Sequence, residues 1–141
     1  MSTLLQIVAT CLYAFVGMIS LVMALKSLRA HEFLPFHEAA AAQPWGELAD
    51  GLKAVILSLL RLSGLGFLIV ALQLAVVAVA GHFRPGLVVM LTLPLLSVLF
   101  CGGLCAVNLQ LHRRTGARTP WKGSLYAAVA IAIGLVISMA R

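Results

Sequence analysis

The chain has 141 residues, of which 62% are hydrophobic and only 10% are charged, against about 25% charged residues in an ordinary soluble domain. Ten Lys and Arg oppose four Asp and Glu, which gives a formal net charge of +6. A chain this short cannot hide so much apolar surface from water, so the composition excludes a soluble domain, a disordered chain, a disulfide scaffold and a nucleic-acid-binding module. It predicts an integral membrane protein, and the Leu-, Ala- and Val-rich makeup is typical of a bacterial inner-membrane protein.

Four apolar segments are long enough, or nearly so, to cross a bilayer as helices, which takes about 20 residues each. They lie at about residues 3–25, 52–80, 86–107 and 123–140. Because a helix satisfies its own backbone hydrogen bonds inside lipid, the predicted fold class is all-α. We expect one domain over residues 1–141, a bundle of four transmembrane helices.

The second segment is longer than a perpendicular crossing requires. Its residues, 52–80, would extend ~44 Å as a helix, against ~30 Å for the hydrocarbon core. The stretch 45–62 at its start is amphipathic. We therefore expect an amphipathic cytoplasmic lead-in to the second helix, with a bend near residues 63–66.

Lys and Arg gather on one side of the predicted bundle, in the first and third connections and the start of the second helix: Lys26, Arg29, Lys53, Arg113, Arg114, Arg118 and Lys122. The other side carries Arg84 and Arg141. The positive-inside rule therefore places loops 26–51 and 108–122 in the cytoplasm and both termini outside.

The third connection combines basic side chains with an aromatic residue beside a membrane span: Arg113, Arg114, Arg118, Trp121 and Lys122. Basic clusters next to a span bind anionic lipid headgroups, and Trp is enriched at the membrane interface. These five residues are predicted to bind lipid, so the bilayer with its anionic headgroups is an expected partner.

Polar residues recur at helical spacing in the first three spans. The first helix carries such a stripe at Gln6, Tyr13, Ser20 and Ser27. If the stripes of the second and third helices face each other, they line a polar crevice open to the cytoplasm. The candidate ligand-binding residues of that crevice are Glu47, Asp50, Arg61, Cys101, Cys105, Asn108 and His112. Stripes of small and polar residues also mark close helix packing, and both interpretations stay open.

Arg61 is the most informative single residue, because it lies within an apolar span. A charge at mid-span costs about 2.5–3.5 kcal/mol on insertion scales. Two explanations fit: Arg61 pairs with Asp50 or Glu47 or reaches the interface, or it attracts an anionic group of a ligand.

Metal and redox chemistry form a further alternative. His31, Glu32, His37 and Glu38 in the first connection are metal-ligand types, but their spacing matches no zinc or di-iron signature. Cys101 and Cys105 share one helix face, where they could respond to oxidation or simply pack. No cofactor is predicted, and metal or haem binding stays open.

No motif specifies a reaction: the chain has no zinc-protease motif, phosphate loop or nucleophile triad. The leading expectation is a non-enzymatic accessory or assembly subunit that packs against another membrane protein or against copies of itself. The alternative is a small transporter or ligand-binding protein that uses the crevice. The third is a metal, haem or thiol-redox protein.

Overall fold

The computed structural model describes residues 2–80 and 86–140. Along this part of the chain the helices are α1 (Ser2–Leu28), α2 (Pro35–Ala41), the 3₁₀ helix η1 (Trp45–Glu47), α3 (Asp50–Ala80), α4 (Leu87–Thr115) and α5 (Trp121–Met139). The helices α1, α3, α4 and α5 are long and apolar enough to cross a membrane. The predicted all-α bundle of four transmembrane helices is therefore confirmed, and the chain is an integral membrane protein. Arg84 and Arg141 lie outside the described residues.

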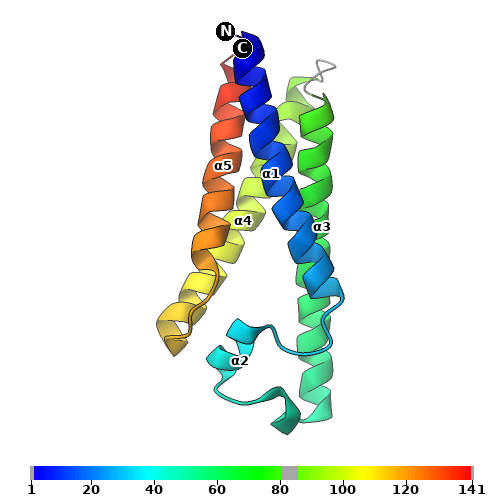
Figure 1. The fold of residues 1–141 in the computed structure, drawn as a ribbon, viewed down its shortest axis with the longest axis vertical. Coiled ribbons are helices and arrows are strands. Elements are labelled where there is room, and N and C mark those ends of the chain that lie inside the picture. Colours follow the sequence, from blue (N-terminus) through cyan, green and yellow to red (C-terminus); the bar gives the residue numbers. More distant parts are fainter. Residues whose placement is uncertain (1, 81–85, 141) are drawn as a thin grey trace.

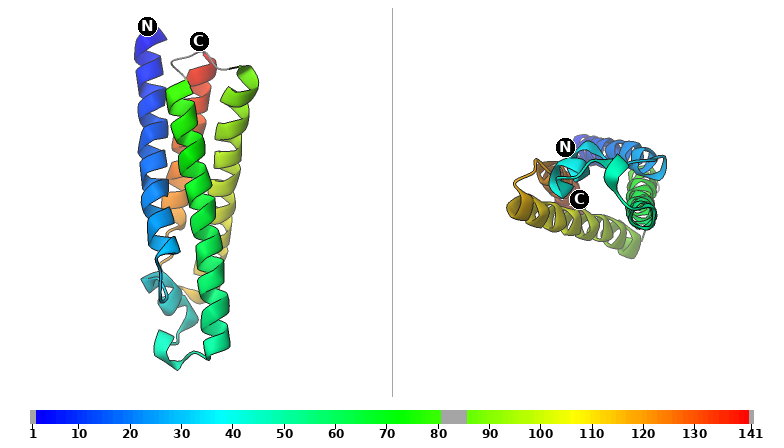
Figure 2. Two further views of the ribbon diagram at one scale, coloured as in Figure 1. Left: turned by 90° about the vertical axis from the view of Figure 1, so that its right-hand side faces the viewer. Right: turned by 90° about the horizontal axis from the view of Figure 1, so that it is seen from below.

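The four long helices run along one axis, with both termini at one end and α2 at the other (Figures 1 and 2). We call the latter the α2 end of the bundle. The helix α4 crosses the bundle obliquely, close to α3 at the terminal end and close to α5 at the α2 end (Figure 1). As a result α3 and α4 separate toward the α2 end, and α2 lies across that opening (Figure 2).

The polar stripe of α1 faces the inside of the bundle, as its seven-residue spacing predicted. Tyr13, Ser20 and Ser27 are all buried, and the Tyr13 hydroxyl lies 3.5 Å from the Ser138 hydroxyl of α5. On the α3 side, a Cβ built on Gly64 would lie 3.1 Å from the Cβ of Ser27. The absence of a side chain at Gly64 therefore lets α1 and α3 approach closely.

The helix α4 continues about two turns beyond the predicted span 86–107, so most of the expected loop 108–122 is helical. It ends at Thr115, where Gly116 adopts a φ of 70° and its N–H donates to the His112 carbonyl at 2.8 Å. The apolar run ends at Val107, but the polar residues that follow still form a helix readily. Hydropathy therefore marked the end of the span rather than the end of the helix.

The first connection is folded rather than extended. Pro35 occupies the first turn of α2, where its fixed φ and missing N–H suit a helix start, and Ala42 in the left-handed region ends it. The lead-in to the second span consists of η1 and the exposed first turns of α3. The helix α3 then runs through residues 63–66 as one α-helix.

Candidate ligand-binding cavity

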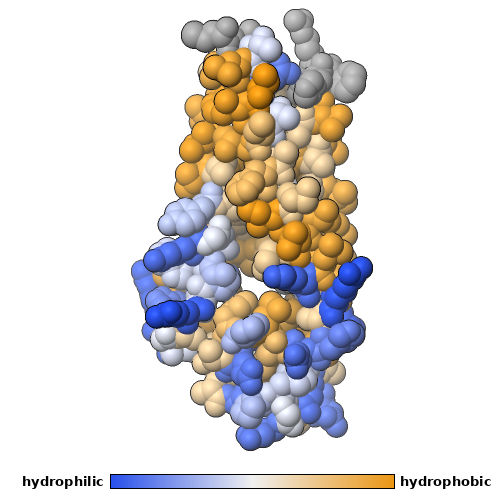
Figure 3. Space-filling view, viewed as in Figure 1, coloured by the Kyte–Doolittle hydropathy of each residue, from blue (hydrophilic) through white to orange (hydrophobic). Residues whose placement is uncertain are grey.

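A cavity of about 820 Å³ lies at the α2 end, where α3 and α4 have separated. It is lined by the α2-end halves of α1, α3, α4 and α5, and α2 covers it. In the space-filling view the surface is hollowed just above α2 (Figure 3). The volume falls within the ~300–1,000 Å³ that is usual for small-molecule sites.

The lining is mainly apolar and combines aromatic with aliphatic side chains, among them Phe15, Phe36, Leu60, Phe67 and Leu104. Its polar members are Ser20, Ser27, His37, Ser63, Asn108, Ser124 and Tyr126. No described lining residue is Lys, Arg, Asp or Glu. Such a surface suits an uncharged, largely hydrocarbon occupant, because a charged group entering it would lose its hydration without gaining an ionic partner.

His37 is the polar side chain that α2 contributes to the cavity. Its Nδ1 atom is buried and has no hydrogen-bond partner among the described residues. Its ring centre lies 4.0 Å from that of Phe36 with the ring planes tilted by 50°, and the ring centre of Phe33 lies at 6.3 Å. Burial lowers the pKa of His37 below its ordinary value, because a low-dielectric site disfavours the imidazolium. Burial therefore favours the neutral imidazole.

An aromatic cluster holds α2 and η1 together. The Phe33 ring meets the Trp45 ring edge-on at 5.0 Å, and Trp45 is half-buried. Sequence analysis missed Phe33 and Phe36 as cavity residues. The available signal was two aromatic side chains in a connection that also carries most of the chain's acidic residues, which indicates a segment that packs on the bundle rather than one that stays in water.

The helix α4 contributes two of its candidate residues to the cavity. Cys101 is buried and Asn108 is half-buried, and both line it. The Asn108 amide donates to the Leu104 carbonyl of its own helix at 2.9 Å. Cys105 and His112 do not line the cavity. The His112 ring instead bonds through Nδ1 to the Ala117 carbonyl at 2.7 Å and so ties down the turn after α4.

The polar stripe that the sequence predicted for the second helix does not face the cavity. Glu47, Asp50 and Arg61 are exposed and do not line the cavity. The face of α3 that does so carries Ile56, Leu59, Leu60, Ser63 and Phe67. The expectation that two polar stripes face each other is therefore wrong, and the crevice between α3 and α4 is apolar.

Two physical reasons explain this rotation of α3. Packing against α1 turns Leu60 and Gly64 inward, and the first turns of α3 extend past the ends of the neighbouring helices (Figure 1). Carboxylates there keep their hydration. Asp50 pairs with Lys53 at 3.4 Å, and no ion pair of Arg61 is found in the part of the chain that the structure describes.

The other candidate residues lie on the surface of the α2 end. His31, Glu32 and Glu38 are exposed, and across residues 2–80 and 86–140 no three His, Cys, Asp or Glu side chains converge as metal ligands would.

In the predicted lipid-binding set, Trp121 is half-buried and the Lys122 Nζ lies 5.7 Å from the centre of the Trp121 ring. Its other basic members are exposed: Arg113, Arg114 and Arg118.

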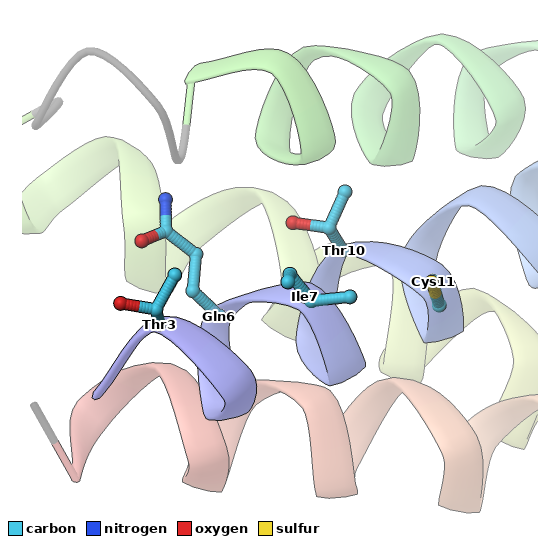
Figure 4. A pocket seen from close by; sticks show the side chains of 5 residues that line it. All are labelled: Thr3, Gln6, Ile7, Thr10 and Cys11. Atoms are coloured by element: carbon cyan, nitrogen blue, oxygen red, sulfur yellow. The ribbon is translucent and has the colours of Figure 1, made fainter. Parts of the chain in front are cut away.

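A second, smaller hollow of about 350 Å³ lies near the termini (Figure 4). Its side chains all come from the first turns of α1: Thr3, Gln6, Ile7, Thr10 and Cys11. Among the described residues a single helix supplies this lining, so the cavity at the α2 end, on which several helices converge, is the better candidate site.

Comparisons of the chain with known protein families, with curated proteins and with solved structures found no match. The site therefore has to be interpreted from its own geometry and chemistry.

Proposed function

We propose that this protein binds a lipid-like, largely apolar ligand in the cavity beneath α2. The observation that carries the proposal is a cavity of about 820 Å³ whose described lining includes no Lys, Arg, Asp or Glu, built from four transmembrane helices and covered by the short helix α2. This is the ligand-binding alternative from the sequence, with an apolar site in place of a polar crevice.

The size of the cavity supports an occupant. An apolar cavity of only about 150 Å³ inside a protein already binds small hydrocarbons. The cavity here is larger and opens at the protein surface, where Phe15 and Leu59 of its lining are exposed. Side chains lining a void lose dispersion contacts on one side. A hydrocarbon chain between Phe15, Phe67 and Leu104 would restore those contacts.

An accessory or assembly role remains a second proposal. Stripes of small residues favoured this role in the sequence, but on α1 Gly17 and Ser20 are buried inside the chain's own bundle. On α4, Gly102 and Gly103 are exposed, and a Cβ on either would meet open space. A partner helix could approach closely there, so co-purification of a membrane protein is the observation that would favour this role.

We further infer that the α2 end faces the cytoplasm of a bacterial inner membrane. Lys26, Arg29, Arg113 and Arg114 lie in the last turns of α1 and α4 or directly after them, at the end that α2 covers. Their clustering supports this orientation through the positive-inside rule.

The binding proposal is tested by purifying the protein from its native membrane in mild detergent and identifying co-purified lipids by mass spectrometry. Ser63→Phe places a bulky ring in the lining of α3, and Ser58→Phe makes the same change on an exposed position of that helix. We expect one lipid class to be enriched over its share of the membrane, and to fall with Ser63→Phe but not with Ser58→Phe. Recovery in bulk proportion, unchanged by Ser63→Phe, would contradict binding in this cavity.

A further inference from the structure

The serines that line the cavity differ from three other helical serines of this chain. A serine hydroxyl inside a helix can donate to the carbonyl four residues earlier, and Ser58, Ser97 and Ser138 do so at 2.8–3.0 Å. The serines of the lining have no side-chain hydrogen bond to any described residue: Ser20, Ser27, Ser63 and Ser124. Their hydroxyls are therefore available to an occupant.

These hydroxyls can be reached from the cavity. If no space adjoined them, their oxygens would be buried polar atoms without a partner, and among the described residues such an atom is found only at His37 Nδ1. Ser20 and Ser27 are otherwise enclosed, since only 5% and 3% of their surface is accessible. Because both residues line the cavity, the accessible part of each lies there.

The unpaired groups come from four helices. Ser27 of α1 and Ser63 of α3 lie at the same depth, since a Cβ on Gly64 would be 3.1 Å from that of Ser27. On α4, the Asn108 amide donates within its own helix, and its Oδ1 accepts no hydrogen bond from a described residue. The helix α5 supplies Ser124. A head with one polar atom would leave most of these groups unpaired, so the lining suits a head with several oxygen atoms.

The lining also limits the charge of that head. Its described residues include no Lys, Arg, Asp or Glu, so neither a phosphate nor an ammonium group would find an opposite charge there. An isolated ion is expensive to bury. Hydroxyl and ester groups are neutral, and both pair with serine, whose hydroxyl donates and accepts. The site therefore favours an uncharged head.

The cavity opens toward the bilayer, which indicates where its occupant comes from. Phe15 of α1 and Tyr126 of α5 line it, yet 66% and 68% of their surface is exposed. Phe15 lies midway along a membrane-spanning helix, so its exposed face meets hydrocarbon rather than water. The surface is hollowed on this side of the bundle (Figure 3). A hydrocarbon chain can enter sideways here, which makes a membrane lipid the source of the occupant.

We propose that the occupant is an uncharged lipid of the acylglycerol class. Its glycerol and ester oxygens form hydrogen bonds with the unpaired hydroxyls, among them those of Ser27 and Ser63, and its hydrocarbon chain lies along the apolar lining at Phe15 and Phe67. This inference rests on the proposed binding function, and it adds the chemistry of the head and the residues that bind it.

The test uses three photoreactive probes in phosphatidylcholine vesicles that contain the full-length protein. They are a monohexadecanoylglycerol, its phosphate ester and hexadecane, each with a diazirine at the same chain position. Labelled residues are mapped by mass spectrometry, and labelling of Leu99, an exposed residue outside the lining, corrects for unequal partition into the bilayer. We expect the acylglycerol to label residues lining the cavity roughly tenfold more than either other probe, since several hydrogen bonds to neutral groups together reach that factor.

Variants of the two neighbouring serines separate hydrogen bonding from the shape of the site. Ser27→Ala and Ser63→Ala each remove a hydroxyl without narrowing the cavity, and each should lower the preference for the acylglycerol over the hydrocarbon about two- to tenfold. The double variant should lower it further, and Ser63→Thr, which keeps a hydroxyl, should retain it. Ser58→Ala removes an exposed hydroxyl of the same helix and should leave it unchanged. A thermal transition close to the wild-type one shows that each variant is folded.

The outcomes distinguish the two proposals. Equal corrected labelling by acylglycerol and hydrocarbon overturns the proposed head, and so does a preference that the double alanine variant leaves unchanged. Stronger labelling by the phosphate ester overturns its neutrality. In each case cavity labelling that Ser63→Phe abolishes still supports the binding function. If no probe labels the cavity, or if Ser63→Phe leaves all labelling unchanged, the binding function itself fails.

Discussion

Gly66 of α3 lies directly against the ring of Phe100 on α4, so close that a Cβ at this position would overlap Cε2 and Cζ of that ring. The same ring meets Phe67 edge-on at 5.5 Å. Here the two helices are in contact, and toward the α2 end α3 and α4 lie farther apart (Figure 1). A glycine on one helix and an aromatic ring on the other therefore mark the inner end of the cavity.

The close approach of α1 and α3 at Gly64 predicts opposite effects of the same substitution at two glycines. A Cβ at Gly64 would lie 3.1 Å from the backbone nitrogen of Leu28 and 3.1 Å from Ser27, and a backbone atom cannot move aside as a side chain can. Gly64→Ala should therefore destabilise the protein by about 1–3 kcal/mol. Gly102→Ala, whose Cβ meets open space, should be neutral or stabilise by up to ~1 kcal/mol. Denaturant titration in mixed micelles measures both, and equal effects would contradict the described packing.

The hydrogen bond between α3 and α4 predicts that removing the Ser97 hydroxyl lowers the free energy of unfolding. Ser97 is fully buried and donates to Gln73 Oε1 at 3.0 Å. Ser97→Ala leaves that oxygen without its partner and should cost ~0.5–2 kcal/mol of unfolding free energy. Ser58→Ala removes an exposed hydroxyl that bonds within its own helix and should change stability by less than ~0.5 kcal/mol. If the two changes cost the same, the Ser97–Gln73 bond does not hold the helices together.

Burial of His37 predicts that α2 leaves the bundle in acid. Because the pKa of His37 is lowered in the folded state, the unfolded or undocked state binds the proton more readily, and docking weakens as pH falls through the ordinary range of histidine and below it. The charged neighbour on α2 is the exposed Glu38, and the described residues that line the cavity with His37 include no Lys, Arg, Asp or Glu.

Trp45, which contacts Phe33 at 5.0 Å, reports the position of this segment. In a Trp121→Phe background, its fluorescence should shift to the red between pH 8 and pH 5 as water reaches the ring. His37→Phe should abolish the shift, and His31→Phe should not. A pH-independent spectrum would show that protonation of His37 does not move α2.

The inferred orientation predicts where reporters at the termini become active. Alkaline phosphatase fused to the C-terminus should be active, and green fluorescent protein fused there should stay dark, because that terminus would lie outside the cytoplasm. A reporter inserted after Ala42, between α2 and η1, should show the opposite pattern. Fluorescence from the C-terminal fusion would reverse the assignment.

The sequence alone was sufficient to predict the class of protein and the number of membrane-spanning helices. Length and hydropathy determine which segments can cross a bilayer, and the seven-residue spacing of Tyr13, Ser20 and Ser27 correctly identified the inner face of α1. These properties are local, because they depend on one helix and its solvent. The continuation of α4 to Thr115 was missed for the same reason, since hydropathy does not distinguish a helix in water from a loop.

Only the tertiary structure decided where the candidate site lies. The polar residues Asp50 and Arg61 suggested the inner face of the second helix, but its packing against α1 through Gly64 turned Leu60 and Ser63 to the inside instead. The cavity itself depends on the oblique course of α4 and on the position of α2 over the opening. Neither can be read from periodicity, because the angle between two helices is set by the shapes of the side chains on both of them. The sequence therefore determined a four-helix membrane protein, and packing between helices determined that its candidate site is apolar.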